Sequence, residues 1–220
     1  MRPSGRTGRG RGTVGDPEPG KATTFTQNLT PLDDLYLLTD TLAALERGGI
    51  IVYPTDTVWG IGCDATDEAA VARVLALKER PVGGGLVSVV DSLEMLRRHV
   101  GVIHPRLQTV LELHARPLTM IYPEPRGLAA GVLAADGSAA IRIAKDAYLQ
   151  ALLSRFGRPI VSTSANLPGA PTPAHFGEIA SDVLRAADHV VRYRQRDKTT
   201  AEPSVIARWN DSNELEPLRA

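Results

Sequence analysis

From residue 31 onward, short apolar runs alternate with segments of helical spacing, and this alternation constrains the fold more than any other feature. Strands that alternate with helices favour an α/β domain, in which helices flank a sheet. The predicted strands are 50–53, 86–90, 118–122, 139–144, 159–163, 189–193 and 204–209. The predicted helices are 32–45, one that begins after Thr66 and ends by Pro81, 92–99, 105–114, 146–156 and 174–186.

Local signals define several helix ends. Thr66 can cap the N-terminus of the second helix, with Asp67 and Glu68 in its first turn, where acidic groups are favoured. Gly48 and Gly49 follow the first helix, and Gly157 follows the helix 146–156. Glycine at these positions is typical of a helix C-terminus.

Composition limits the class of protein. With 220 residues, 43% of them hydrophobic, the chain can bury one core of ordinary size. The 25 Lys and Arg residues balance the 25 Asp and Glu residues, so no global charge attracts nucleic acid or a membrane. The single cysteine excludes an internal disulfide, the histidines lack zinc-ligand spacing, and no apolar run spans a bilayer. These features predict a cytoplasmic protein without structural zinc.

The first 30 residues differ from the rest of the chain. They are rich in Gly and Pro, carry several Arg residues and have few large apolar groups. Such a segment cannot bury enough apolar surface to offset the entropy of ordering, so residues 1–30 are predicted to be a disordered basic tail. The tail could contact RNA phosphates, but a plain solubilising extension is the favoured interpretation. Residues 31–220 are predicted to form one folded domain.

The segment 53–60, Tyr-Pro-Thr-Asp-Thr-Val-Trp-Gly, directly follows a predicted strand. Its polar groups, on Thr55, Asp56 and Thr57, would lie at the strand end, where α/β sheets usually bind ligands. The alternative is a tight turn in which Thr and Asp side chains bond only to local backbone groups.

The segment 78–85 combines two cations with three glycines. Lys78 and Arg80 close the second helix, and three glycines, 83–85, follow. Cations at a helix C-terminus are also common on plain surfaces, because the helix dipole favours them. The triple glycine favours a ligand site, since its backbone can approach a ligand closely beside the two cations. No Gly-Lys-Ser/Thr follows, so the segment is not a Walker motif.

Two further strands carry polar groups. The strand 159–163 contains Ser162 and leads into Ser164 and Asn166. These polar groups could bond to phosphate or to an amino acid, or could simply form a turn. No G-x-S-x-G elbow surrounds the serines, which disfavours nucleophilic catalysis. Arg142 lies within an apolar strand, where a guanidinium needs a partner and suits a substrate carboxylate. An edge strand with one wet face is the alternative.

In this order, the segments Pro-Thr-Asp-Thr-Val-Trp-Gly, Lys-Glu-Arg-Pro and Ser-Thr-Ser-Ala-Asn-Leu-Pro-Gly resemble the YrdC family of threonylcarbamoyl-AMP synthases, and 203–206 resembles its late Pro-Ser-Thr-Ile/Val strand. The resemblance spans about residue 33 to the C-terminus and fits the short single-domain form. It implies a twisted open mixed sheet with flanking helices and a large concave cavity. It also implies a nucleotidyltransferase that uses ATP with Mg²⁺, L-threonine and bicarbonate, and whose product serves tRNA modification by a downstream threonylcarbamoyl transferase complex.

The resemblance also implies roles for individual residues. The predicted threonine-binding residues are Thr57, Arg142, Ser162 and Ser204. The predicted nucleotide-binding residues are Lys78, Arg80, Ser138, Ser164, Asn166, Thr172 and Arg219. Lys78 and Arg80 are also the predicted catalytic residues, because transfer at phosphorus needs alignment and positive charge, and little covalent help. No protein-bound metal site is predicted.

Two positions depart from the family pattern: Gly84 stands where many relatives have Lys or Asn, and Arg116 where a glycine is usual. One alternative function is a non-catalytic module of the same fold that binds tRNA or double-stranded RNA, with affinity that falls steeply with salt. Another is a carbamoyl-adenylate enzyme with a different acceptor, as in the related domain of hydrogenase-maturation proteins.

Overall fold

The computed structural model describes residues 31–210 and 212–219, and in them nine strands form one mixed sheet. The strand order is β7-β1-β2-β6-β3-β5-β4-β8-β9. The strands are β1 (Ile51–Tyr53), β2 (Gly60–Gly62), β3 (Val87–Val90), β4 (Leu118–Tyr122), β5 (Ala139–Ile143), β6 (Ile160–Ser164), β7 (His189–Val190), β8 (Val205–Trp209) and β9 (Leu215–Arg219). Three neighbouring pairs, β1 with β7, β3 with β5 and β4 with β8, are parallel, and the other five are antiparallel.

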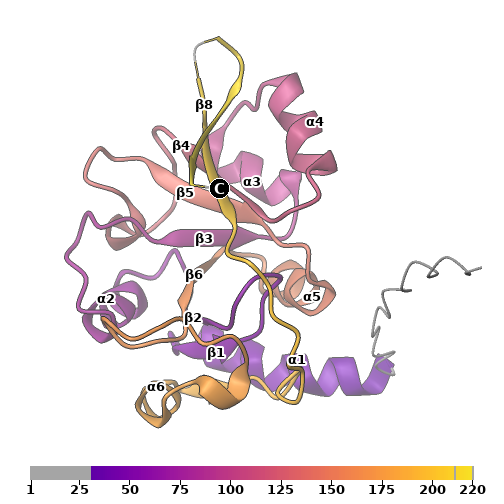
Figure 1. Ribbon diagram of the computed structural model, residues 1–220, viewed down its shortest axis with the longest axis vertical. Helices are drawn as coiled ribbons and strands as arrows, with labels where there is room; N and C mark the ends of the chain where they lie inside the picture. Colours follow the sequence, from indigo (N-terminus) through magenta and orange to yellow (C-terminus); the bar gives the residue numbers. More distant parts are fainter. Residues whose placement is uncertain (1–30, 211, 220) are drawn as a thin grey trace, which may run out of the picture.

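Helices pack against this sheet in separate groups (Figure 1). They are α1 (Pro31–Glu46), α2 (Glu68–Leu77), α3 (Leu93–Val100), α4 (Pro105–Leu113), α5 (Ala147–Phe156) and α6 (Ser181–Ala186). Three apolar clusters form the core: one joins α2 to β2 and β6, one joins α1 and α5 to β1, and one joins α3 and α4 to β4 and β5. The predicted α/β class, with helices flanking a sheet, is confirmed. No helix in the described residues is long and apolar enough to cross a bilayer.

The cap of α2 differs from the prediction. Asp67, not Thr66, is the N-cap, and its carboxylate accepts hydrogen bonds from the backbone N–H groups of Ala69 and Ala70. Thr66 instead donates both its backbone N–H and its hydroxyl to Asp64. An ionised carboxylate is a stronger acceptor than a hydroxyl near the positive end of a helix, which accounts for the shift by one residue.

Two other predicted elements differ from the structure, and two strands were not predicted. The strand predicted at 189–193 pairs only over His189–Val190, and the helix predicted at 174–186 is a short turn, Phe176–Glu178, followed by α6. The strands without a predicted counterpart are β2, in which a single isoleucine stands between two glycines, and β9, which is an edge strand with a proline. Neither segment contains an apolar run or an alternation long enough to predict a strand. The predicted tail, 1–30, lies outside the described residues.

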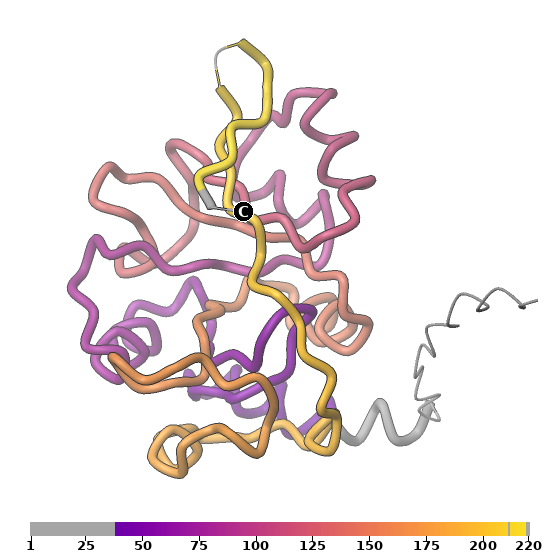
Figure 2. Tube along the Cα trace, viewed as in Figure 1, coloured from indigo at the N-terminus to yellow at the C-terminus, as the bar shows by residue number. Residues whose placement is uncertain are grey.

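The topology brings the polar segments together. The loop 54–59 connects β1 to β2, and β6 lies between β2 and β3, so the loop, Ser162 and Ser164 share one part of the sheet. The segment 191–204, which contains a turn at 193–196, crosses from β7 to β8 near the opposite edge and passes the loop 54–59 (Figure 2). Residues from both ends of the chain thereby reach one face of the sheet.

Candidate active site

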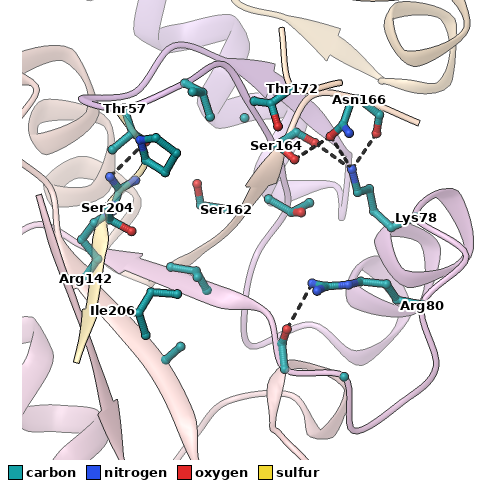
Figure 3. Close-up of a pocket in the computed structure, with 18 of the residues that line it drawn as sticks. Thr57, Lys78, Arg80, Arg142, Ser162, Ser164, Asn166, Thr172, Ser204 and Ile206 are labelled. Atoms are coloured by element: carbon teal, nitrogen blue, oxygen red, sulfur yellow. Dashed lines mark hydrogen bonds between the residues drawn. The ribbon is translucent and has the colours of Figure 1, made fainter. Parts of the chain in front are cut away.

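One cavity of about 620 Å³ lies on this face of the sheet. Side chains two apart on a strand share a face, and the cavity follows this rule at Ala140 and Arg142 on β5 and at Ser162 and Ser164 on β6. The predicted residues that line it are Thr57, Lys78, Arg80, Ser138, Arg142, Ser162, Ser164, Asn166, Thr172 and Ser204. Thr57 and Arg142 lie on one side and Lys78 and Arg80 on the other, with Ser162 between them (Figure 3). A shared cavity is what the sequence analysis required of these residues.

Arg142 is buried in the middle of the sheet and paired with a carboxylate. Its side chain is 3% exposed, and Nη1 donates to Asp56 Oδ1 at 2.6 Å and to Thr57 Oγ1 at 3.2 Å. The Nε atom is buried and has no hydrogen-bond partner among the described residues. Strand β5 lies between β3 and β4, so the alternative of an edge strand is wrong. The unpaired Nε leaves a donor that an anionic ligand would satisfy.

Asp56 is the residue that the sequence analysis noted without giving it a role. Besides pairing with Arg142, it accepts a hydrogen bond from the backbone N–H of Lys145 at 3.0 Å. The signal for this partner was present, because a buried arginine needs a carboxylate and Asp56 belongs to the same motif as Thr57. Asp56 therefore ties the loop 54–59 to the end of β5.

Thr55 organises the loop from within. Its hydroxyl bonds to the Thr57 hydroxyl at 2.8 Å, donates to the Val58 carbonyl and accepts from the Thr57 backbone N–H. Thr55 thus matches the local-turn alternative, whereas Asp56 and Thr57 reach across to Arg142. On the same side, the Ser204 hydroxyl bonds to buried Thr119 at 2.8 Å, and Thr119 pairs with Arg142 in the sheet.

Lys78 donates its hydrogen bonds to the end of β6 and the loop that follows it. Its Nζ lies 2.9 Å from the Ser164 carbonyl, 2.6 Å from the Asn166 carbonyl and 2.9 Å from Asn166 Oδ1. Three bonds are the full capacity of an ammonium group. Burial, and then the positive charge of Arg80, lower the pKa of Lys78 to about 8. Lys78 therefore fixes this loop and supplies charge to the cavity, while its donors face protein oxygens.

Arg80 has the opposite character. It is exposed, and it makes one long hydrogen bond, 3.3 Å from Nη1 to the Gly85 carbonyl. Gly83 and Gly85 have φ values of 87° and 63°, which favour glycine, and they place the backbone of 83–85 against Ala134 at the cavity wall. Most of the Arg80 guanidinium is thus available to a ligand beside a closely approaching backbone.

The remaining predicted nucleotide residues contribute mainly oxygen atoms and an amide. The Ser164 hydroxyl donates to Asn166 Oδ1 at 2.5 Å, and Asn166 Nδ2 donates to the Ala170 carbonyl. The Ser138 hydroxyl donates to Asp136 Oδ1 at 2.6 Å, and this bond lowers the pKa of Asp136. Thr172 is exposed at the rim. The Ser164 and Ser138 hydroxyls keep lone pairs for a ligand.

Arg219 ends the last strand of the sheet, next to a residue that lines the cavity. Its backbone pairs with this residue, Ile206, but its side chain lies outside the described part of the chain. Its predicted contact with nucleotide stays a prediction. Cys63 is fully buried away from the cavity, and burial raises the pKa of its thiol, which disfavours a reactive thiolate.

Fold and cavity together define the class. The protein has an open, mixed α/β sheet and a cavity on one face of it. A buried guanidinium lies at one end of the cavity, and two cations with hydroxyl groups lie at the other. Such a site suits two different anionic groups held side by side. The family model Sua5/YciO/YrdC, described as telomere recombination, matches residues 43–220. The chain belongs to this family, and the predicted resemblance is confirmed.

Curated relatives are similar over most of their length. The threonylcarbamoyl-AMP synthase of Xanthomonas euvesicatoria pv. vesicatoria is 39% identical over 163 residues, which cover 70% of this chain and 87% of that protein. The threonylcarbamoyl-AMP synthase of Xanthomonas oryzae pv. oryzae is 38% identical over 157 residues, or 70% of this chain and 84% of that protein.

Solved structures share the fold. P. abyssi Sua5 complexed with L-threonine superposes with a TM-score of 0.68 at 24% identity, covering 80% of this chain. This chain spans about half of that protein, 51% of its length. E. coli YciO gives a TM-score of 0.67 at 22% identity and covers 85% of this chain and 91% of its own. The twisted mixed sheet with flanking helices is therefore the family fold.

Proposed function

We propose that this protein is a threonylcarbamoyl-AMP synthase, a nucleotidyltransferase that converts L-threonine, bicarbonate and ATP to threonylcarbamoyl-AMP and pyrophosphate. The curated relatives at 38–39% identity bear that name. The observation that carries the proposal is the single cavity in which Arg142 faces one end and Lys78 and Arg80 face the other. The reaction needs an amino acid and a triphosphate at attacking distance, and this cavity offers both ends in one space.

At the threonine end, Arg142 binds the substrate carboxylate. Asp56 holds Nη1 and so fixes the plane of the guanidinium at the cavity wall, where its remaining N–H groups would donate to the carboxylate. The hydroxyls of Thr57, Ser162 and Ser204 surround the amino acid. A guanidinium in a buried, preorganised position loses little freedom on binding, which favours affinity for a small substrate.

At the nucleotide end, the two cations differ in task. Arg80 contacts the phosphates directly, while Lys78 supplies positive charge and holds Ser164 and Asn166 in place for the nucleotide. The threonine amine and bicarbonate form a carbamate with loss of water, and an oxygen of this carbamate attacks the α-phosphorus. The new O–P bond forms as the bond to the pyrophosphate oxygen breaks, and the cations balance the charge that builds on pyrophosphate.

Magnesium enters with ATP as part of the substrate. The residues that line the cavity include hydroxyls and an amide but no carboxylate, and the described residues hold no group of three His, Cys, Asp or Glu placed for a metal ion. Magnesium prefers to keep several waters and to bind phosphate oxygens, so the triphosphate supplies its main ligands. The ion adds positive charge at the phosphates.

Threonine-dependent release of pyrophosphate from ATP tests the proposal. The protein should release pyrophosphate with magnesium, bicarbonate and threonine, and much less when serine replaces threonine. Equal release without an amino acid would contradict the assignment. In the cell, the product would pass to a transferase complex that modifies a tRNA adenosine.

The alternative, a non-catalytic RNA-binding module, makes a different prediction. Its affinity for tRNA would fall steeply as salt increases and would not respond to threonine. The exposed Arg80 is compatible with phosphate of either kind. The buried Arg142, at 3% exposure, is not accessible to a polyanion backbone, which favours a small anionic substrate.

A further inference from the structure

A second arginine, Arg194, lies behind the threonine end of the cavity without lining it. It belongs to the segment 191–204 and has a φ of 58°, which is uncommon for a residue with a side chain. Its Nη1 donates to the Thr55 carbonyl at 3.1 Å and to Asp146 Oδ2 at 3.2 Å, and its Nε donates to Asp197 Oδ2 at 2.9 Å. One guanidinium thus joins three segments.

Each of the three segments carries a part of the threonine end. The carbonyl belongs to Thr55, whose hydroxyl orients Thr57. Asp146 caps α5 through the Leu149 N–H, and α5 directly follows the strand of Arg142. Asp197 accepts the Thr199 N–H within the segment that leads to Ser204. The bonds of Arg194 therefore set the distances among these parts.

Charge gives the same residue a second task. Burial, and to a smaller extent the nearby negative charge of Asp56, raise the pKa of Asp146, while Arg194 lowers it. Without Arg194, the Asp146 carboxylate would be mostly buried next to Asp56 with no cation of its own. An uncompensated carboxylate beside Asp56 would compete with it for the positive charge of Arg142 and so disturb the Asp56–Arg142 pair.

We propose that Arg194 is a positioning residue for the amino-acid substrate: it holds the loop 54–59 so that Thr57 and Asp56 face Arg142. This inference rests on the proposed function. A backbone conformation that is rare for a non-glycine residue persists only where surrounding bonds hold it, and such positions cluster at functional sites. The nucleotide end has no contact with Arg194 among the described residues, so its loss should affect threonine and spare ATP.

The test compares Michaelis constants for the two substrates. Arg194→Ala should raise the KM for threonine by about tenfold or more, as expected for lost charge-assisted hydrogen bonds, and should change the KM for ATP by less than about twofold. Arg194→Lys should fall between, because lysine keeps the positive charge but lacks the planar, forked donors that match the three acceptors. Adding Asp146→Asn to Arg194→Ala should recover part of the loss, since it removes the uncompensated carboxylate and keeps a capping oxygen.

Arg73→Ala is the matched control. Arg73 also joins a backbone carbonyl, that of Gly48 at 3.1 Å, to a carboxylate, Asp188 at 2.8 Å, but it lies away from the cavity. Its loss should leave both KM values unchanged. If Arg194→Ala does not fold, Arg194→Lys tests the same proposal: its KM for threonine should rise more than its KM for ATP.

The outcomes separate the two proposals. A wild-type protein that releases no pyrophosphate with threonine overturns the proposed function, and this inference with it. An active wild type whose Arg194 variants keep the threonine KM, or raise both KM values equally, overturns only the positioning role.

Discussion

Replacing Arg142 tests whether one guanidinium serves both the fold and the substrate. The side chains of Arg142 and Asp56 are 3% and 8% exposed, so Arg142→Ala leaves a buried carboxylate without its partner. Breaking a buried pair in this way costs about 3–5 kcal/mol, a large part of the roughly 5–15 kcal/mol that stabilises a domain. The variant should therefore fold but unfold at a temperature lower by roughly 6–20 °C.

The loss of threonine binding in Arg142→Ala can be measured separately from the loss of stability. A carboxylate held by two hydrogen bonds from a guanidinium loses roughly 3–6 kcal/mol when the donor is removed, or about 10²–10⁴-fold in the KM for threonine. A double variant, Arg142→Met with Asp56→Asn, removes both charges and keeps similar volumes. It should regain most of the stability, because neutral replacements of buried pairs are often tolerated, and none of the threonine affinity.

Two assays on the same samples measure these effects: urea unfolding for the free energy, and pyrophosphate release at increasing threonine concentration for the KM. A double variant with the wild-type KM would refute the role of Arg142 in binding the carboxylate. Wild-type stability in Arg142→Ala would refute the energetic importance of the pair.

Three further predictions concern the cations and the sheet. Because Lys78 has a pKa of about 8 and a triphosphate prefers its charged form, the KM for ATP should rise as the pH increases through 8, and Lys78→Met should abolish this dependence. Arg80→Ala should raise the KM for ATP by about tenfold or more and leave the KM for threonine unchanged, which kinetics at saturating co-substrate would measure. Gly62→Ala should prevent folding, since a Cβ there would lie 1.8 Å from the Val161 carbonyl oxygen, whereas Gly60→Ala, at 3.4 Å or more from its neighbours, should fold, as circular dichroism would show.

The sequence predicted the fold wherever apolar spacing was strong. Strands such as β4 and helices such as α5 have long apolar patterns with clear ends, and their bounds agree with the prediction within a residue or two. The prediction failed at β2 and β9, which are held in the sheet by their neighbours on either side or by one partner, not by their own composition. Strand pairing between distant segments leaves no local signal.

Most of the predicted site residues line one cavity. The motifs allowed these residues to be predicted from the sequence, and the order of the strands in the sheet brings them together. Hydrogen bonds between distant segments could not be predicted from the sequence. The three oxygen atoms around Lys78 and two of the three partners of Arg194 lie 48 to 139 residues away in sequence, and no spacing rule connects them. Asp56 could have been assigned, since a buried arginine in a strand calls for a nearby carboxylate.

In the proposed reaction, the carbon of bicarbonate and the amino group of threonine become part of one adenylate, formed in this one cavity. Incubation of the protein with ATP, magnesium, threonine and ¹³C-labelled bicarbonate, followed by mass spectrometry, tests it most directly. This reaction predicts a threonylcarbamoyl adenylate that gains one mass unit from the label, that is absent with serine, and that disappears in the Arg142 variants. Pyrophosphate release without this labelled adenylate, or an adenylate that Arg142→Met with Asp56→Asn still forms at the wild-type rate, would contradict it.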